Sequence, residues 1–406
     1  MGLIVQKFGG TSVGTPERIR QVAKRIEKTV SEGHPLVVVV SAMGHTTDEL
    51  ITLAQQVSDR PPHREMDMLL SAGERISMAL LSMALGDCKV PAISLTGSQS
   101  GIITDQSHRR ARIRRILGDR IRSALDEKKV VIVAGFQGVS ETKEITTLGR
   151  GGSDTTAVAL AVALRADRCE IFTDVDGVYS ADPRVVSSAS LWERIPHDLM
   201  VELATRGAGV LHPRCVELAK QNQMKLCVKN SLDLNERAGT TLIHRQSGDS
   251  SLGMEEFGVV GVTSDKGKIL IRLRLTRSTV LASVWDRSAE AHLSLVSPVF
   301  SDHDVSFYSE RDGESEWKKI LHDLTTEGFI SSYEILSDIV PVSVVGDRFS
   351  QDGRALYEMI EVLSREHVPV VAGSSSALAV TLGVSMGRVD DAVRALHAQF
   401  LESKKV

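Results

Sequence analysis

Cysteine is scarce in this sequence, and its few copies are scattered. Four occur among 406 residues, at Cys88, Cys169, Cys215 and Cys227, and no two form a CxxC pair. A disulfide framework and a cysteine-built zinc site are therefore not expected. Free thiols of this kind are typical of a reducing compartment, so we expect the protein in the cytoplasm.

An excess of either charge and long apolar runs are also missing. Lys and Arg number 48 and Asp and Glu 52, which gives a formal charge of −4. Nucleic-acid binding by the whole chain would need a net basic surface, so it is not expected. Because no apolar run approaches the ~18 residues of a membrane span, we expect no membrane partner. Residues 1–7 do not have the arrangement of a signal peptide.

Aromatic residues make up only 4% of the chain, whereas glycine, with 32 residues, is present at an ordinary level. The position of the glycines is therefore more informative than their number. With domains of roughly 100–200 residues, a chain of this length predicts two or three domains.

Short β-branched strands alternate with amphipathic helices through residues 1–245. This pattern predicts an α/β fold, with a doubly wound, mostly parallel sheet in an α/β/α sandwich. Several strands end in small residues, and ligands in such sheets bind outside the carboxyl ends of the strands. The expected strands with this design are Leu3–Phe8, Leu36–Val40, Ala92–Leu95, Val130–Val133 and Glu170–Phe172.

The pattern changes after a linker expected at residues 246–258. Residues 259–406 predict a separate α+β region of two small regulatory units, the first degenerate. We expect strands at 342–345, 368–371 and 377–382 and helices at 352–365 and 389–401.

A glycine-rich turn follows the first strand, in Lys7-Phe8-Gly9-Gly10-Thr11-Ser12-Val13-Gly14. Its glycines would let backbone N–H groups approach an anion, and the lysine adds a positive charge. The turn is either a phosphate cradle or a plain tight connection between strand and helix.

A second such loop, Gly149-Arg150-Gly151-Gly152-Ser153-Asp154, opens another expected helix. Arg150 carries a fork suited to a carboxylate, and Asp154 could organise Lys7 or a magnesium ion. The alternative is an N-capped helix after a loop.

Two further candidates are weaker. The turn from Thr173 to Tyr179, followed by Asp182-Pro183-Arg184, could hold a base and phosphates or be an ordinary turn. Glu74 is expected to start a helix, where an acid usually only compensates the helix dipole.

The order of these motifs, together with Ser41-Ala42-Met43-Gly44, resembles the aspartate kinases of the amino-acid kinase family. The resemblance covers nearly all of residues 1–245, and the C-terminal part is similar to tandem ACT domains. It implies the amino-acid kinase fold and ATP-dependent phosphorylation of the β-carboxylate of L-aspartate to 4-phospho-L-aspartate. This reaction begins the synthesis of lysine, threonine and methionine.

The resemblance also implies the roles of individual residues. Lys7 and Asp154 would be catalytic. Aspartate would be bound by Ser41, Thr47, Glu74, Phe136 and Arg150, with Glu74 at its amino group and Arg150 at its α-carboxylate. The nucleotide would be bound by Gly9, Gly10, Thr11, Ser12, Thr173, Asp174, Tyr179, Arg184 and Lys229. ATP would be used with Mg²⁺, and no metal site built by the protein is expected.

The chain departs from the family pattern at two places. Gly209 stands where the family often has a lysine that reaches the nucleotide phosphates, and Arg206 or Lys229 could compensate. Asp286-Arg287-Ser288-Ala289 lacks the Pro-Gly that is typical of the first strand-to-helix turn of an ACT unit. A homodimer through the ACT-like region is still what the resemblance implies. Because this turn is where an amino-acid effector usually binds, we expect feedback control by such an effector to be weak or absent.

Two alternatives remain open. Another member of the family would phosphorylate glutamate or N-acetylglutamate instead. A catalytically silent amino-acid sensor would keep only the fold, although the presence of both Lys7 and Asp154 argues against it.

Overall fold

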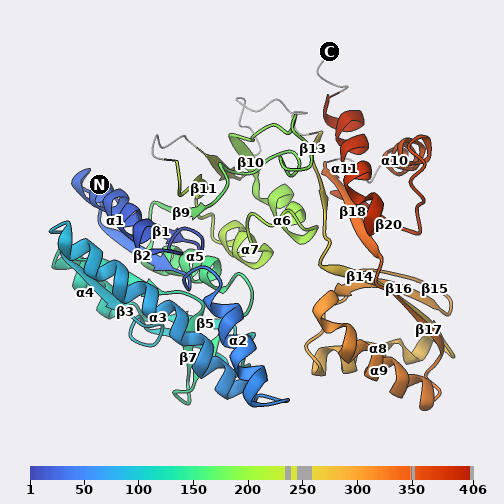
Figure 1. Ribbon diagram of the computed structural model, residues 1–406, viewed down its shortest axis with the longest axis horizontal. Helices are drawn as coiled ribbons and strands as arrows, with labels where there is room; N and C mark the ends of the chain where they lie inside the picture. Colours follow the sequence, from blue (N-terminus) through green and yellow to red (C-terminus); the bar gives the residue numbers. More distant parts are fainter. Residues whose placement is uncertain (234–238, 245–257, 348, 350–352, 403–406) are drawn as a thin grey trace. The chain divides into compact units, whose positions relative to one another are not determined.

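The computed structural model describes residues 1–233, 239–244, 258–347, 349 and 353–402. Contacts divide the chain into two compact units (Figure 1). The first comprises Met1–Val178, Leu191–Val201 and Gly209–Asp249, and the second Tyr179–Ser190, Glu202–Ala208 and Ser250–Val406. Two segments expected within 1–245 thus group with the second unit. Nearly all of the expected linker lies outside the described residues.

The first unit is built on an eight-stranded sheet in the order β10-β12-β11-β9-β1-β2-β6-β3. All its described strand pairs are parallel except β11–β12. This confirms the predicted doubly wound sheet. The strands are β10 (Arg194–Pro196), β12 (Thr240–Ile243), β11 (Leu226–Asn230), β9 (Arg168–Thr173), β1 (Ile4–Phe8), β2 (Leu36–Val40), β6 (Val130–Ala134) and β3 (Ala92–Leu95).

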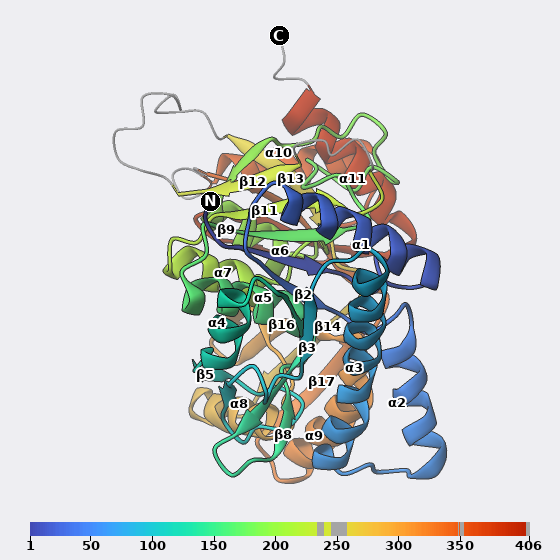
Figure 2. The same ribbon diagram turned by 90° about the vertical axis from the view of Figure 1, so that its left-hand side faces the viewer.

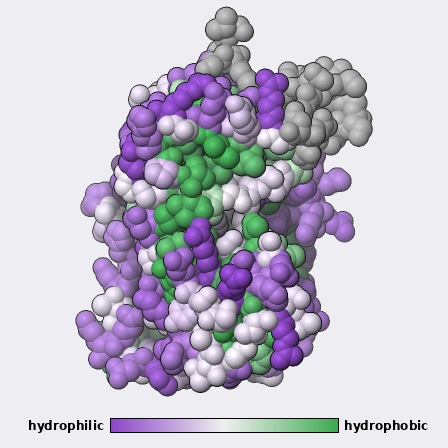
Figure 3. Space-filling view, turned by 90° about the vertical axis from the view of Figure 1, so that its right-hand side faces the viewer, coloured by the Kyte–Doolittle hydropathy of each residue, from purple (hydrophilic) through white to green (hydrophobic). Residues whose placement is uncertain are grey.

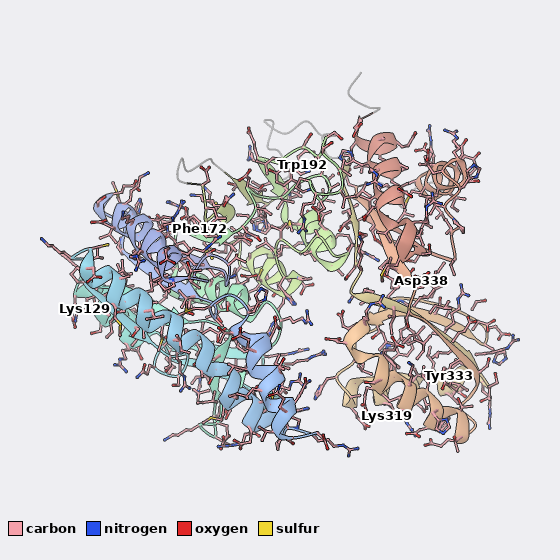
Figure 4. The ribbon with its side chains drawn as sticks, in the orientation of Figure 1. Lys129, Phe172, Trp192, Lys319, Tyr333 and Asp338 are labelled. Atoms are coloured by element: carbon pink, nitrogen blue, oxygen red, sulfur yellow. The ribbon has the colours of Figure 1, made fainter. Side chains whose placement is uncertain are left out.

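Helices cover both faces of this sheet. On one face, α1 (Pro16–Ser31) and α3 (His63–Asp87) enclose a core that includes Phe8 and Phe172. Their rings stack at 4.7 Å between centroids, and Figure 4 labels Phe172 in β9. On the other face, α5 (Gly152–Leu164) packs on β1, β2 and β9, and α7 (Pro213–Gln221) packs on α5. Because successive residues of a strand point to opposite faces, Lys7 faces α5.

The helix α3 corrects one prediction. It begins at His63, so Glu74 lies in its middle and does not start it. Ile76 and Leu80, on the same helix, are exposed. The helix is long and apolar enough to span a membrane by composition, but half of that stretch is buried, as in a core helix. Figure 2 shows α2 (Thr46–Val57) beside it.

The first unit also contains a small sheet in the order β5-β4-β7-β8. It consists of β5 (Ile113–Ile116), β4 (Ile102–Thr104), β7 (Gln137–Ser140) and β8 (Ile145–Thr147). The helix α3 packs against β8, which leads directly into the glycine-rich loop before α5.

The second unit contains two four-stranded sheets with helices packed on them. One has the order β13-β18-β20-β19, with α10 (Arg354–Arg365) and α11 (Val389–His397). Its strands are β13 (Val259–Ser264), β18 (Ile339–Gly346), β20 (Ala379–Ser385) and β19 (Ala372–Ser375). The expected strand 368–371 is wrong, because β19 begins later.

The other sheet has the order β15-β16-β14-β17, with α8 (Leu281–Glu290) and α9 (Glu314–Thr326). Its strands are β15 (Val296–Ser301), β16 (Asp304–Glu310), β14 (Lys268–Leu275) and β17 (Ile330–Leu336). Along the chain its strands and α-helices follow the order β14-α8-β15-β16-α9-β17, and the degeneration expected of the first ACT-like unit stays a prediction. Asp286–Ala289 lies inside α8, and the strand-to-helix turn is instead Thr276–Val280.

Apolar side chains gather on one surface of the second unit (Figure 3). Among the large apolar and aromatic residues of the second unit, Phe300, Tyr357 and Ile360 are exposed. A hollow of about 580 Å³ is lined by residues of β15, α10 and β19, including Val299, Ile360 and Ser374.

Candidate active site

An ion pair joins the ends of β1 and α5. Lys7 Nζ lies 2.6 Å from Asp154 Oδ1, and the two side chains are only 11% and 13% exposed. Asp154 stands in the first turn of α5, which crosses the face of the sheet to which Lys7 points. The structure thus brings together the two residues expected to be catalytic.

The glycine-rich turn after β1 packs tightly on the turn after β2. Gly9 N–H donates to Phe172 O at 3.2 Å, and Gly44 N–H donates to Gly10 O at 3.1 Å. A Cβ at Gly10 would lie 2.9 Å from Ala42 O, so a larger residue would separate the two turns. Glycine is therefore needed at this position for the close approach.

The same turn contains a buried hydroxyl group with no hydrogen-bond partner in the described part of the chain. Ser12 is 1% exposed, and its Oγ has no hydrogen bond among the described residues. Thr11 beside it is exposed. A buried hydroxyl normally finds a partner, so this one is suited to a ligand oxygen.

The N-terminus of α5 can bind an anion. Gly151, at its N-cap, has φ +65°, and no side chain in the described part of the chain caps the helix. A Cβ at Gly151 would lie 2.2 Å from His212 Cβ, so glycine also permits the approach of the turn before α7. Uncapped N–H groups and the positive end of the helix dipole favour a phosphate group.

Glu74 is a buried carboxylate at the same edge. It is 3% exposed, and its Oε1 accepts from Ala42 N–H at 3.2 Å. Its Oε2 has no hydrogen-bond partner within the described residues. Burial raises the pKa of Glu74 to about 7, although hydrogen bonds and the charge of Lys7 act in the opposite direction. Such a group can accept a cationic ligand.

The other residues expected to bind substrate come from neighbouring loops. Ser41 N–H donates to Phe8 O at 3.1 Å, which places Ser41 one strand from Lys7. Thr47 is in the first turn of α2. Phe136 has φ +67°, an uncommon conformation for a bulky residue. Arg150 is exposed between two glycines with positive φ.

Of the residues expected to bind the nucleotide, Thr173 and Asp174 lie at the end of β9, beside β1. Thr173 O accepts from Ser231 N–H at 2.8 Å, and Thr173 shares the face of Lys7. Tyr179 and Arg184 belong to the second unit, where Arg184 Nη2 binds Asp182 Oδ2 at 2.8 Å.

Lys229 does not join this group. In the sheet register it pairs with Phe172, so its side chain lies on the face opposite to Lys7. Its Nζ donates to Glu170 Oε1 at 2.8 Å, and Glu170 also accepts from Gln6 and Arg168. Arg206 is likewise engaged, with Glu202, Ser297 and Thr381. Both side chains, expected as replacements for the lysine absent at Gly209, are thus bound to other groups.

One residue of this region was missed by the sequence analysis. Asp67 is fully buried in α3 and accepts hydrogen bonds from the segment before β5 and from β8. The only signal was an acidic residue inside the apolar run Met66-Asp67-Met68-Leu69-Leu70, which suggests a buried, paired carboxylate.

Comparison with known proteins places this site in a family. Residues 2–230 match the amino acid kinase family. An aspartokinase of Geobacillus stearothermophilus is 43% identical over 416 residues, which covers 98% of this chain and 97% of that protein. Aspartokinase 2 of Bacillus subtilis is 41% identical over 413 residues, with 100% and 99% covered.

Solved structures give the same result. E. coli aspartokinase III in complex with aspartate and ADP (R-state) superposes with a TM-score of 0.83 at 24% identity, over 98% of this chain and 99% of that one. The aspartate kinase from Synechocystis is 40% identical, with a TM-score of 0.55, over 98% of this chain and 69% of that one.

Proposed function

This chain belongs to the aspartokinases of the amino acid kinase family, and we propose that it phosphorylates the β-carboxylate of L-aspartate with ATP. The observation that carries this proposal is the Lys7–Asp154 pair between two glycine-rich turns. The products are 4-phospho-L-aspartate and ADP. The acyl phosphate would feed the synthesis of amino acids derived from aspartate.

The chemistry requires positioning and positive charge more than proton transfer. The β-carboxylate is already ionised at neutral pH, so no general base is needed. A carboxylate oxygen forms a bond to the γ-phosphorus while the bond between that phosphorus and the β–γ bridging oxygen breaks, and ADP leaves. Lys7, held by Asp154, and the N-terminus of α5 would stabilise the negative charge of the transferring group.

Two groups of opposite charge would orient aspartate. Glu74 has a carboxylate oxygen available for the ammonium group, and Arg150 would bind the α-carboxylate through its fork. Ser41, Thr47 and Phe136 would surround the side chain. Glutamate is one methylene longer than aspartate. With its ammonium group and α-carboxylate held in the same way, its γ-carboxylate would not lie where the β-carboxylate of aspartate lies.

The nucleotide would lie along the turns after β1 and β9, contacted by Gly9, Gly10, Thr11, Ser12, Thr173 and Asp174. Mg²⁺ would enter with ATP as its magnesium complex. No group of three or more His, Cys, Asp or Glu in the described residues could hold a metal ion. The ion would be held mainly by the phosphates, which is the usual mode for magnesium with nucleotides.

An assay of ADP release with separate amino acids tests the function. We expect activity with aspartate, none with glutamate or N-acetylglutamate, and its loss in Lys7→Ala. Activity with N-acetylglutamate would favour the other kinase of the family. ATP and aspartate binding without ADP release would identify a silent sensor.

We further propose that the second unit is regulatory and mediates a homodimer. Its exposed apolar surface, with Phe300 and Ile360, supports this proposal because such surfaces commonly mark interfaces. Sedimentation of the wild-type protein and of Phe300→Asp tests it.

We also propose that the protein works in the cytoplasm. Its four free thiols support this proposal, because free thiols are typical of a reducing compartment.

A further inference from the structure

We propose that Asp67 is a positioning residue for the loop Gly149–Asp154, and thereby sets the affinity for the amino-acid substrate. Asp67 lies on α3 and is 0% exposed. The phosphoryl-transfer mechanism does not use it. The proposal rests on the proposed function in one respect, namely that Arg150 in this loop binds the α-carboxylate of aspartate.

Asp67 accepts hydrogen bonds from two separate segments. Its Oδ2 accepts from His108 Nδ1 at 2.7 Å, and both oxygens accept from Arg109 N–H, at 3.1 and 3.2 Å. Its Oδ1 also accepts from Thr147 Oγ1 at 2.6 Å. A buried charge with this set of donors resists movement, because displacing any donor leaves it poorly satisfied.

Both segments lead to the loop. Thr147 is the last residue of β8, two positions before Gly149. Arg109 has φ +66°, and its carbonyl oxygen lies so close to Gly149 that a Cβ there would be 2.8 Å away. Asp67 therefore fixes both the strand that enters the loop and the backbone on which the loop packs.

A second side chain holds the loop from the other side. Arg214, on α7, donates to Leu148 O at 3.1 Å and to Ala111 O at 3.0 Å. The backbone just before Arg150 is thus fixed from both α3 and α7. Arg150 directly follows Gly149 in the chain, so the position of its backbone follows from this support.

Two adjacent threonines provide a matched test. Thr146 and Thr147 are both buried in β8, and each hydroxyl makes a hydrogen bond of 2.6 Å, Thr146 with Thr104 and Thr147 with Asp67. The variants Thr147→Val and Thr146→Val make the same chemical change. Only the first removes a contact of Asp67.

In steady-state kinetics, we expect Thr147→Val and Asp67→Asn to raise KM for aspartate about tenfold, with kcat and KM for ATP changed less than about twofold. Thr146→Val should leave all three close to wild type. A purely structural role would lower the active fraction and hence kcat, without changing KM. Equal KM values for aspartate in the two threonine variants would overturn the proposal.

Hydrogen exchange separates this proposal from the proposed function. We expect Leu148 and Gly152 amides, which donate to Phe136 O and Gly149 O, to exchange faster in Asp67→Asn and Thr147→Val than in Thr146→Val. Equal exchange in all variants overturns the positioning role. If wild type does not phosphorylate aspartate but the exchange differs as expected, the proposed function fails while the positioning role stands.

Discussion

Lys7 Nζ and Asp154 Oδ1 lie 2.6 Å apart, although one residue lies near the end of the first strand and the other in the first turn of a helix far along the chain. The pair is mostly buried, and its lysine points to the positive end of α5. Two sources of positive potential therefore converge on one place, where a phosphoryl group would be stabilised during transfer.

Lys7→Met should abolish most of the activity. We expect kcat to fall about 1,000-fold or more, because a positive charge at the transferring phosphoryl group is lost. Lys229→Met is the matched control, since Lys229 also pairs with a buried carboxylate but on the opposite face of the sheet. That variant should keep kcat within about twofold and lose about 1–2 kcal/mol of stability. Equal losses of kcat in both variants would contradict this assignment.

Glu74 should make stability and substrate binding depend on pH. Its pKa is raised to about 7 in the folded protein, so the native state holds a proton that the unfolded chain releases between pH 4.5 and about 7. Stability therefore falls as pH rises through this range, by about 3 kcal/mol in total. Glu74→Gln should be more stable than wild type above about pH 8 and similar near pH 4.5.

Urea unfolding across this range measures the difference, and Glu170 supplies the control. Burial alone would raise the pKa of Glu170, but Lys229, Arg168 and Gln6 outweigh it and lower the pKa. Glu170→Gln should therefore destabilise the protein, and more so at high pH. KM for aspartate should fall as Glu74 ionises in the wild type. A pH-independent difference between wild type and Glu74→Gln would refute this role.

Gly209→Lys should lower KM for ATP, by up to about tenfold, because it adds a positive charge at the position where, by the resemblance, the family often has a lysine that reaches the nucleotide phosphates. Gly209 is exposed and has φ +68°, so a side chain there costs about 1–2 kcal/mol of strain. Gly209→Gln carries the same strain without charge and serves as the control. If both variants have the same KM for ATP, the position has no part in nucleotide binding.

Lysine and threonine at submillimolar concentration should inhibit weakly or not at all. The expected turn at residues 286–289 lies within α8, but the actual turn, Thr276–Val280, also lacks Pro and Gly. Weak or absent feedback control is therefore still expected, because the turn that lacks Pro and Gly is now Thr276–Val280. Initial rates at increasing effector concentration test it, and half-maximal inhibition below a millimolar concentration would show it to be wrong.

Local physics made much of the first unit predictable from the sequence. Leu36–Val40 is fully buried, as an uninterrupted apolar strand predicts. The helix after the first loop begins with a local signal that the sequence contains, a threonine followed by proline and an acid: Thr15 at its N-cap accepts from Arg18 N–H at 3.3 Å. These features depend on neighbours within a few residues, so the order of residues is sufficient to identify them.

Other assignments needed the sheet order and the packing of helices. The sequence could not show that Lys229 pairs with Glu170 on the face opposite to Lys7, because this depends on which strands are neighbours. Glu74 was placed at a helix start because the apolar pattern of α3 does not mark where the helix begins.

The sequence by itself determined the glycine-rich turns. It shows which expected strands are followed by glycine and that the charged residues Lys7, Arg150 and Asp154 lie beside such glycines. Tertiary structure alone decided which charges meet, since contacts such as Lys7–Asp154 and Asp67–Thr147 join segments distant in the chain. It also decided that Glu74 is buried, with one oxygen that has no hydrogen-bond partner among the described residues, because burial is a property of the packed fold and not of any local run of residues.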